Sequence, residues 1–306
     1  MSSTQTEKLG TSIDLYQIVT DRIIDLLEKG TSPWRRTWGQ YGLARNYYGK
    51  DVPYTGINMV MLNLVAPYQI PYYLTWKQIQ EAGGQVIKGS KAEWVYFYKV
   101  YYKDADGKPI SKEEAENQND SKKVSFLKRF KVFNVECIAG IEFQFPENLN
   151  RDNNTIANCE ELIGSMPEKP VFKNVDGNEA YYDPTNDVLN VPNISQFENS
   201  EAFYSTTFHE LAHWTGHKKR LARPGIIDAN NFGSEPYGLE ELVAEMSACY
   251  LCAITGIDRE GLMQNNAAYI QGWLKTLRED NRLVFKAAAA AQKAVDYITG
   301  GKVTAM

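Results

Sequence analysis

The chain has 306 residues, 43% of them hydrophobic, with four cysteines and a formal net charge of −5 at pH 7. This length exceeds what one hydrophobic core usually organises, and the composition is that of a globular protein, which excludes a disordered chain and a disulfide-stapled scaffold. No apolar run reaches membrane-span length and the first residues lack the basic and apolar regions of a secretory signal, so we expect a cytoplasmic protein with no membrane partner.

The first half, residues 1–145, is predicted to form a small α+β domain. Apolar residues recur there with helical or strand periodicity in five segments. In chain order these are helices over residues 12–29, 57–65 and 75–82, then strands over residues 93–102 and 123–135. The polar insertion between the two strands is too hydrophilic to pack and is expected to be a mobile loop. A further polar stretch predicts an interdomain linker over residues 146–155.

This first domain combines positive charge with aromatic residues. Residues 29–103 hold ten Lys or Arg against three Asp or Glu, whereas residues 146–306 hold 14 against 22. Bases stack on rings while cations follow phosphates, so the composition favours single-stranded DNA as a partner, with double-stranded DNA as a second candidate. The candidate contacts are Trp34, Arg35, Arg36, Trp38, Arg45, Tyr47, Lys50, Tyr54, Trp76, Lys88 and Lys91. The alternative is a small aromatic core with solvated charges around it; Trp94, Tyr96 and Tyr98, for example, alternate as one face of a strand.

The second half, residues 156–306, is also predicted to be α+β. The expected elements are a helix over residues 159–166, a hairpin of strands 180–182 and 188–191, a helix from about residue 200 to Gly216, a helix over residues 237–248, and mostly helix from there to about residue 299. Cys249 and Cys252 form the sequence C-Y-L-C inside one of these helices. Without a second cysteine pair or a nearby histidine, they are expected to pack in the core.

All three histidines of the chain lie within nine residues, and the first two frame the sequence H-E-L-A-H. On a helix, His209 and His213 stand one above the other and can direct both imidazoles at one ion, while Glu210 can reach a water on that ion. His217 would lie about 12 Å along the axis from His209 and beyond the stop at Gly216, outside such a site. The alternative is a surface helix that carries these residues by accident.

A catalytic zinc usually has a third protein ligand. The position that metzincins use for a third histidine is Lys219 here, so the ligand is expected downstream in Y-G-L-E-E-L-V-A-E. Glu241 as ligand with Glu245, one turn on, orienting a ligand histidine is the gluzincin arrangement, and Glu240 is the fallback ligand. The alternative for these glutamates is a solvated helix face. The ligand set suits Zn²⁺ but also accepts Mn²⁺, Co²⁺ or Ni²⁺.

Several segments resemble the ArdC-type antirestriction proteins. In the second half these are Y-Y-D-P-T-N-D-V-L-N-V-P, F-Y-S-T-T-F-H-E-L-A-H-W-T-G-H-K-K-R-L, Y-G-L-E-E-L-V-A-E and A-A-Y-I-Q-G-W-L-K-T-L; in the first half they are T-G-I-N, L-T-W-K-Q-I, V-I-K-G-S-K and F-K-V-F-N-V. Nearly the whole chain is covered, in order. The resemblance implies a single-stranded DNA-binding domain followed by a zincin-like, gluzincin-type metallopeptidase domain, and a role in protecting incoming conjugated plasmid DNA from host restriction endonucleases.

Under this reading the ion held by His209, His213 and Glu241 would activate a water, and Glu210 would take its proton. Tyr237 and Tyr204 are candidate oxyanion donors. A restriction enzyme is a candidate protein substrate. Two other readings stay open: a protein that occludes DNA with a structural or vestigial metal site and no proteolysis, and a peptidase whose basic aromatic domain recruits protein.

Overall fold

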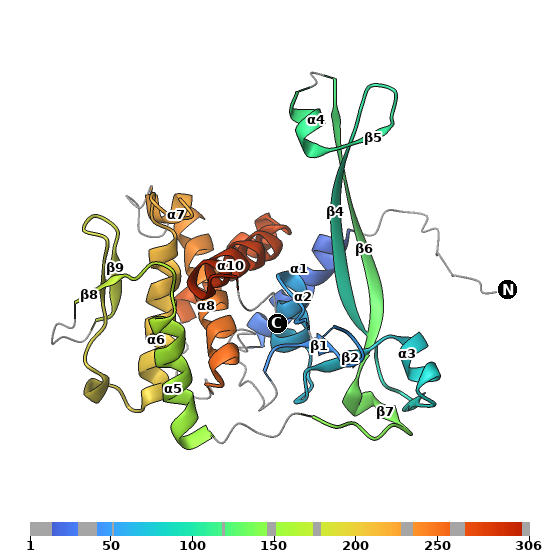
Figure 1. The fold of residues 1–306 in the computed structure, drawn as a ribbon, viewed down its shortest axis with the longest axis horizontal. Helices are drawn as coiled ribbons and strands as arrows, with labels where there is room; N and C mark the ends of the chain where they lie inside the picture. The colour runs from blue at the N-terminus through green and yellow to red at the C-terminus, as the bar shows by residue number, and fades with distance from the viewer. Residues whose placement is uncertain are drawn as a thin grey trace.

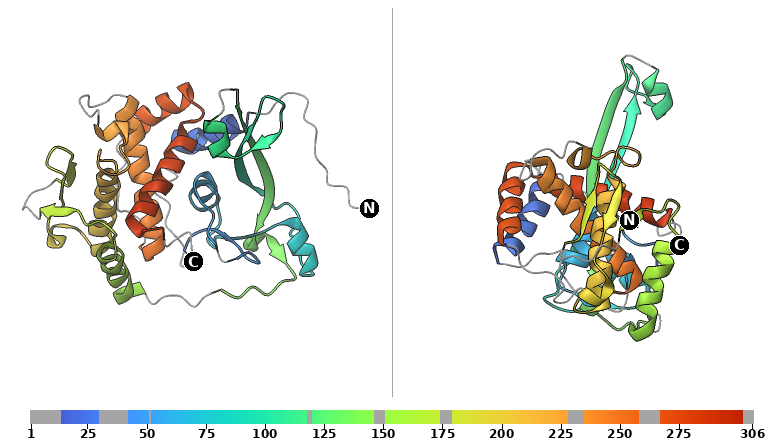
Figure 2. Two further views of the ribbon diagram at one scale, coloured as in Figure 1. Left: turned by 45° about the horizontal axis from the view of Figure 1, so that its top comes forward. Right: turned by 90° about the vertical axis from the view of Figure 1, so that its left-hand side faces the viewer.

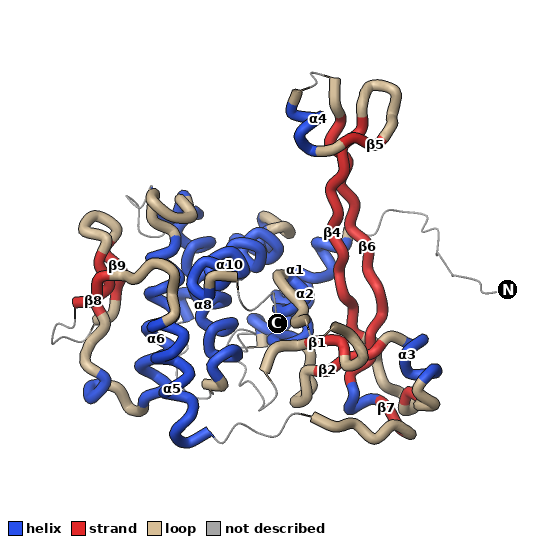
Figure 3. Tube along the Cα trace, viewed as in Figure 1, coloured by secondary structure: helices blue, strands red, loops and turns tan. Residues whose placement is uncertain are grey.

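The computed structural model describes residues 14–29, 42–50, 52–117, 120–145, 151–173, 179–227, 235–257 and 267–301. Figure 1 shows a predominantly helical body on one side and a sheet with a projecting two-stranded ribbon on the other. Both halves of the chain contain helices and strands, as Figure 3 shows by colour. The structure therefore confirms the expected two-part α+β architecture. Within the described residues, every helix is too short or too polar to cross a membrane.

The first half is organised by a five-stranded sheet in the order β1-β2-β6-β4-β5. Its strands are β1 (Arg45–Asn46), β2 (Tyr72–Leu74), β4 (Glu93–Lys103), β5 (Pro109–Ile110) and β6 (Lys122–Asn134), and only the β1–β2 pair is parallel. Helix α2 (Ile57–Met59) runs into a π-helical segment over Val60–Val65, and both lie where one helix was expected. Helix α3 (Trp76–Glu81) begins at a capping box on Thr75. The short strands β3 (Gln85–Val86) and β7 (Ile138–Ala139) form a separate pair.

Strands β4 and β6 form a long antiparallel ribbon that stands away from the body (Figure 1). The insertion between them carries β5 and the short helix α4 (Lys112–Glu116) at the tip of the ribbon, so part of the expected loop has secondary structure, while its mobility stays a prediction. The physical reason is local: Ser111 and Glu114 form a capping box that starts α4, and β5 pairs with the end of β4. A polar composition excluded a core but not this short-range hydrogen bonding.

The second half is a helical layer with a small sheet. Its helices are α5 (Arg151–Gly164), α6 (Ser200–Thr215), α7 (Pro224–Ile227), α8 (Glu235–Thr255), α9 (Ala267–Glu279) and α10 (Leu283–Thr299), and its sheet has the order β8-β10-β9, built from Val171–Lys173, Val188–Asn190 and Tyr181–Asp183. Helices α6 and α8 lie side by side and α10 packs against both (Figure 2). Helix α5 begins at Arg151, so the second part of the expected linker is helical, while residues 146–150 lie outside the described part of the chain.

The first helix, α1 (Leu15–Glu28), packs against the last two helices rather than only against its own half. Its buried side chains Val19, Ile23 and Leu27 belong to the same apolar cluster as Leu277 and Val284. A polar contact also joins α1 to the last helices: the Thr20 hydroxyl donates a hydrogen bond to the Asn281 carbonyl at 2.8 Å. The two halves therefore share one core, and the expected boundary at residue 145 does not separate two independent packing units.

Candidate metal centre

The motif helix α6 is defined by its ends and its burial. The Asn199 side chain accepts a hydrogen bond from the Ala202 amide at 2.8 Å and caps the first turn, and Gly216 caps the last. The face that carries Phe208, Leu211 and Ala212 is fully buried. This packing holds the helix that carries the H-E-L-A-H sequence in place. Its two histidines therefore lie one turn apart on a rigid helix.

His209, His213 and Glu241 converge between α6 and α8. The two Nε2 atoms are 3.1 Å apart, and the Glu241 carboxylate oxygens lie 3.6 Å from each of them. Among the described residues, these three form a group of potential ligand atoms within 4.8 Å of one another. For ligand atoms about 2.1 Å from an ion, tetrahedral geometry requires separations of about 3.4 Å. The three side chains therefore fit one face of a tetrahedral divalent metal site.

The charge of the site also favours a cation. Burial by itself would lower the pKa of His209, but the hydrogen bond to Glu241 and the nearby charges of Glu245 and Glu210 outweigh it and raise that pKa to about 9. The Glu241 carboxylate and the two Nε2 atoms thus face one small volume, and Glu210 and Glu245 add negative charge close by. A divalent ion bound here would balance the negative charge of the carboxylates. The two histidines would then be neutral, as metal ligation requires.

The other ring nitrogen of His213 is held by Glu240. Its Nδ1 lies 3.1 Å from Glu240 Oε1, and the same carboxylate receives two hydrogen bonds from Arg223, at 2.6 and 2.8 Å. Burial opposes ionisation, yet Arg223 and His213 hold the pKa of Glu240 below its ordinary value. A carboxylate that accepts the Nδ1 proton leaves Nε2 free to bind metal. Glu240 is therefore placed to orient His213, and the geometry favours Glu241 over the fallback Glu240 as the ligand.

Arg223, which holds Glu240 in place beside His213, was not predicted from the sequence. Besides Glu240, it donates to the Thr215 hydroxyl at 2.7 Å and to the Ala212 carbonyl at 2.6 Å, at the end of α6. The close approach depends on Gly216, where an added Cβ would stand 2.9 Å from the guanidinium and 2.6 Å from Ile226. The only signal in the sequence was a glycine and an arginine shortly after the motif, which many helix ends share.

The other predicted site residues have different positions relative to the ligand group. Glu245 Oε1 lies 3.7 Å from His209 Nδ1, a buried nitrogen without a hydrogen bond, so Glu245 faces that atom, and its role as the orienting carboxylate stays a prediction. Glu210 is buried beside the site. The Tyr204 hydroxyl instead donates to Glu160 at 2.6 Å, which speaks against its role as an oxyanion donor. Tyr237 is in α8, but its side chain lies outside the described part.

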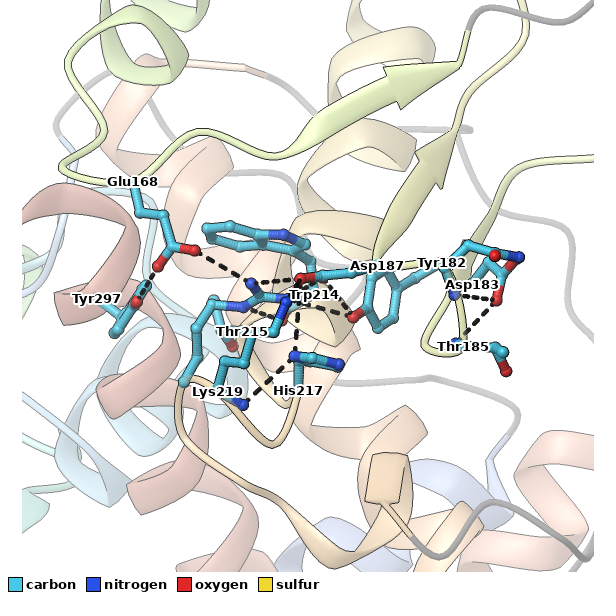
Figure 4. A network of polar contacts seen from close by, with 12 residues as sticks. Glu168, Tyr182, Asp183, Thr185, Asp187, Trp214, Thr215, His217, Lys219 and Tyr297 are labelled. Carbon is cyan, nitrogen blue, oxygen red and sulfur yellow. Dashed lines mark hydrogen bonds and ion pairs between the residues drawn. The ribbon is translucent and has the colours of Figure 1, made fainter.

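His217 lies beyond α6 and outside the ligand group, in a second polar network (Figure 4). The centre of that network is Arg220, whose side chain is 1% exposed and stacks 3.9 Å from the Trp214 ring. Its guanidinium binds Asp187, in the turn between β9 and β10, and donates to the Tyr182 hydroxyl at 3.2 Å. Arg220 thereby fixes the β9–β10 hairpin to the end of the motif helix.

Replacing Arg220 with Met should destabilise the protein by about 1.5 to 3 kcal/mol, because it removes the charge-assisted hydrogen bonds of a buried guanidinium and leaves Asp187, which is 21% exposed, without that partner. Lys219 is a matched control: its Nζ is 3.8 Å from the same Asp187, but its side chain is 68% exposed. Lys219→Met should cost less than about 1 kcal/mol. Urea denaturation followed by circular dichroism measures both, and equal losses would contradict the role of burial.

The expected DNA contacts fall into three groups. Trp34, Arg35, Arg36 and Trp38 lie outside the described residues, whereas Lys50, Trp76, Lys88 and Lys91 are exposed, Trp76 to 52%. The Tyr47 ring contacts Tyr72, Phe143 and Phe145 edge-on, Tyr54 lines an apolar cavity with Tyr250, and the Arg45 guanidinium lies 5.8 Å from the Tyr72 ring. For Tyr47 and Tyr54 these contacts favour the alternative of an aromatic core.

Comparisons with known proteins agree with this arrangement. Residues 13–133 match the N-terminal domain of the anti-restriction factor ArdC, and residues 161–290 match a zincin-like metallopeptidase. The chain is 31% identical to a DNA primase TraC of Escherichia coli over 302 residues and 30% identical to a second one, but it spans only 27% and 20% of these relatives. It is also 29% identical to an uncharacterized protein, y4eC, of Sinorhizobium fredii, and covers 92% of it.

Solved structures extend the similarity to the whole fold. The metal-free crystal structure of the antirestriction protein ArdC from plasmid R388 superposes with a TM-score of 0.71 at 35% identity, covering 94% of this chain and 97% of that one. Its Mn(II)-bound structure gives a TM-score of 0.69 at 34% identity and covers 94% and 98% of the two chains. A divalent metal therefore fits this zincin-like domain. With both domains matched in order and a solved relative covered almost end to end, the chain belongs to the family of ArdC antirestriction proteins.

Proposed function

We propose that this protein binds single-stranded DNA and protects incoming DNA, such as a conjugated plasmid, from host restriction endonucleases, and that it carries a metal-dependent peptidase-like centre. The observation that carries the proposal is the similarity to the R388 antirestriction protein over nearly the whole of both chains. The charge of the first half supports it, because a surplus of Lys and Arg over residues 29–103 attracts phosphates.

In the proposed centre, His209, His213 and Glu241 would hold the ion, with Zn²⁺ and Mn²⁺ both compatible with these ligands. When bound, such an ion acidifies a water and polarises a carbonyl. Glu210 is the base that would accept the water proton and pass it to the leaving amine. Glu240 and Glu245 would hold the two imidazoles in orientation. The arrangement is that of a peptidase, and a restriction enzyme is the proposed class of protein substrate.

A protection assay tests the antirestriction function. DNA is incubated with the purified protein, a type II restriction endonuclease is added, and the surviving fraction of uncut substrate is measured by gel electrophoresis. We expect protection that rises with protein concentration and falls steeply with salt, since phosphate contacts are lost as counterions compete. Cleavage at the same rate with and without the protein, for single-stranded and double-stranded substrates alike, would rule the proposal out.

A second candidate is a DNA-occluding protein whose metal site is structural or vestigial. The sharing of one core between the two halves favours it, because an ion held between α6 and α8 also stabilises the framework on which the first half is mounted. The two candidates differ in whether hydrolysis is needed for protection.

A further inference from the structure

The outer face of the β4–β6 ribbon exposes two aromatic rings. Phe97 on β4 and Phe130 on β6 are each 51% exposed. In the antiparallel register Phe97 lies opposite Lys128, and Phe130 lies opposite Val95, so all four side chains point to one face. Phe97 and Phe130 are diagonal neighbours, which places them about 7 Å apart on that face. Large apolar rings at such exposure on a free-standing ribbon indicate a binding surface.

The two faces of the ribbon differ in what already covers them. On the inner face, Tyr96 is 6% exposed and contacts Phe285 of α10 edge-on. Trp94 on that face is covered by Arg129 and Lys131, at 4.0 and 5.2 Å from its ring. The inner rings are therefore occupied by the protein itself. The outer face is buried at its base, where Val132 packs in a small core, whereas Phe97, Lys128 and Phe130, farther along the ribbon, are exposed.

The charge of the ribbon selects the kind of partner. Its two strands carry seven cationic residues and one carboxylate: Lys99, Lys103, Lys122, Lys123, Lys128, Arg129 and Lys131 against Glu93. In the register, Lys103, Lys122 and Lys128 alternate onto the face of Phe97 and Phe130, whereas Arg129 and Lys131 lie on the inner face with Trp94. Glu93 is buried and paired with Arg22 of α1 at 2.5 Å, so it does not offset the surface charge. The tip between the strands is acidic, with six Asp or Glu against two Lys over residues 104–121. A polyanion is attracted along the stalk of the ribbon and repelled at its tip.

We propose that the outer face of the β4–β6 ribbon holds a single strand of DNA, with bases stacked on Phe97 and Phe130 and phosphates along the lysines of the stalk. The proposal rests on the proposed function and names its DNA-binding surface. Stacking requires unpaired bases, which gives the surface its preference for single strands, and rings accept any base, which makes it tolerant of sequence. This site differs from the aromatic cluster around Tyr47, whose rings pack against one another.

The test uses the full chain and a fluorescein-labelled oligothymidylate, with affinity measured by fluorescence anisotropy. Phe97→Ala and Phe130→Ala should each weaken binding about fivefold or more, and the double variant more than either. Phe97→Trp with Phe130→Trp should restore it. Lys128→Ala should lower the slope of log affinity against log salt by about 0.7. The matched control is Val171→Ala with Phe172→Ala, which removes apolar side chains that are 61% and 37% exposed on β8 in the other half.

The outcomes separate this inference from the proposed function. If the wild-type protein binds the oligonucleotide and the double Phe variant binds it equally well, the surface is wrong and the proposed function stands. If the wild-type protein does not bind, both fail. If the double variant changes only the mass of the protein in solution, measured by light scattering, the face belongs to a second copy of this chain. Equal weakening by the β8 control would also overturn the assignment.

Discussion

Protein carrying Glu241→Ala is expected to purify without a stoichiometric divalent ion, whereas Glu240→Gln should retain it. The two glutamates are adjacent in the sequence but have different positions: Glu241 faces both Nε2 atoms at 3.6 Å, and Glu240 faces His213 Nδ1 on the opposite side of the ring. Removing a ligand opens the site, while loosening an orienting carboxylate lowers affinity by about 10- to 100-fold. Mass spectrometry of bound metal and calorimetric titration with Mn²⁺ or Zn²⁺ measure the difference.

The control for this comparison is stability. Glu240 is 3% exposed and pairs with Arg223, so its replacement also disturbs a buried ion pair. Thermal unfolding of both variants in EDTA shows whether each is folded before metal is added. Folded Glu241→Ala protein that binds metal as tightly as the wild type would contradict the ligand assignment, as would folded Glu240→Gln protein that binds none.

Glu210→Gln should leave metal binding intact and reduce peptide hydrolysis by about 10²- to 10⁴-fold, because it removes the base without changing the shape of the side chain. The measurement uses fluorescein-labelled casein as a general probe, with metal content determined on the same samples. His209→Ala, which removes a ligand, is the comparison that should lose both properties. Hydrolysis that is unchanged in Glu210→Gln protein would show that this carboxylate is not the base.

The same variant separates the two functional candidates. If Glu210→Gln protein holds its metal and protects DNA from restriction as well as the wild type, occlusion of DNA is sufficient and hydrolysis is unnecessary. If protection is lost while oligonucleotide affinity is kept, peptide chemistry is required. The comparison is informative because the proposed base and the proposed DNA surface lie in different halves of the chain.

The metal centre was largely predictable from the sequence because its geometry is local to two helices. The i, i+4 spacing of His209 and His213 fixes their common face on any helix, and Glu241 lies on the one later helix with suitable carboxylates. The distinction between Glu240 and Glu241 was not predictable, since both fall on the inner side of α8 and both are largely buried. The distinction depends on Arg223, which a loop places against the end of α6. Because loops have no periodic pattern in the sequence, this position could not be predicted.

The DNA surface was the least predictable part. Counting rings and cations directed the proposal to the first half of the chain but could not tell a ring that stacks on its neighbours from one that faces solvent. Tyr47 and Tyr54 were candidate DNA contacts, but Tyr47 packs against neighbouring rings and Tyr54 lines an apolar cavity. Phe97 was not among the candidate contacts. The alternation in β4 predicts one face with Trp94 and Tyr96, but it does not predict whether Phe97, on the opposite face, is exposed. Exposure of an apolar side chain is decided by tertiary packing, not by its local pattern.

The docking of α1 onto α9 and α10 has a consequence for how the protein is made. Helix α1 is synthesised well before α9 and α10, the helices that cover Val19, Ile23 and Leu27, because a long stretch of chain separates them in the sequence. Closing so long a segment is entropically costly and slow, and until it happens the apolar side of α1 lacks its native cover. We therefore expect residues 1–145 to depend on chaperones until α9 and α10 have been synthesised, and the docking of α1 to be a late step of folding.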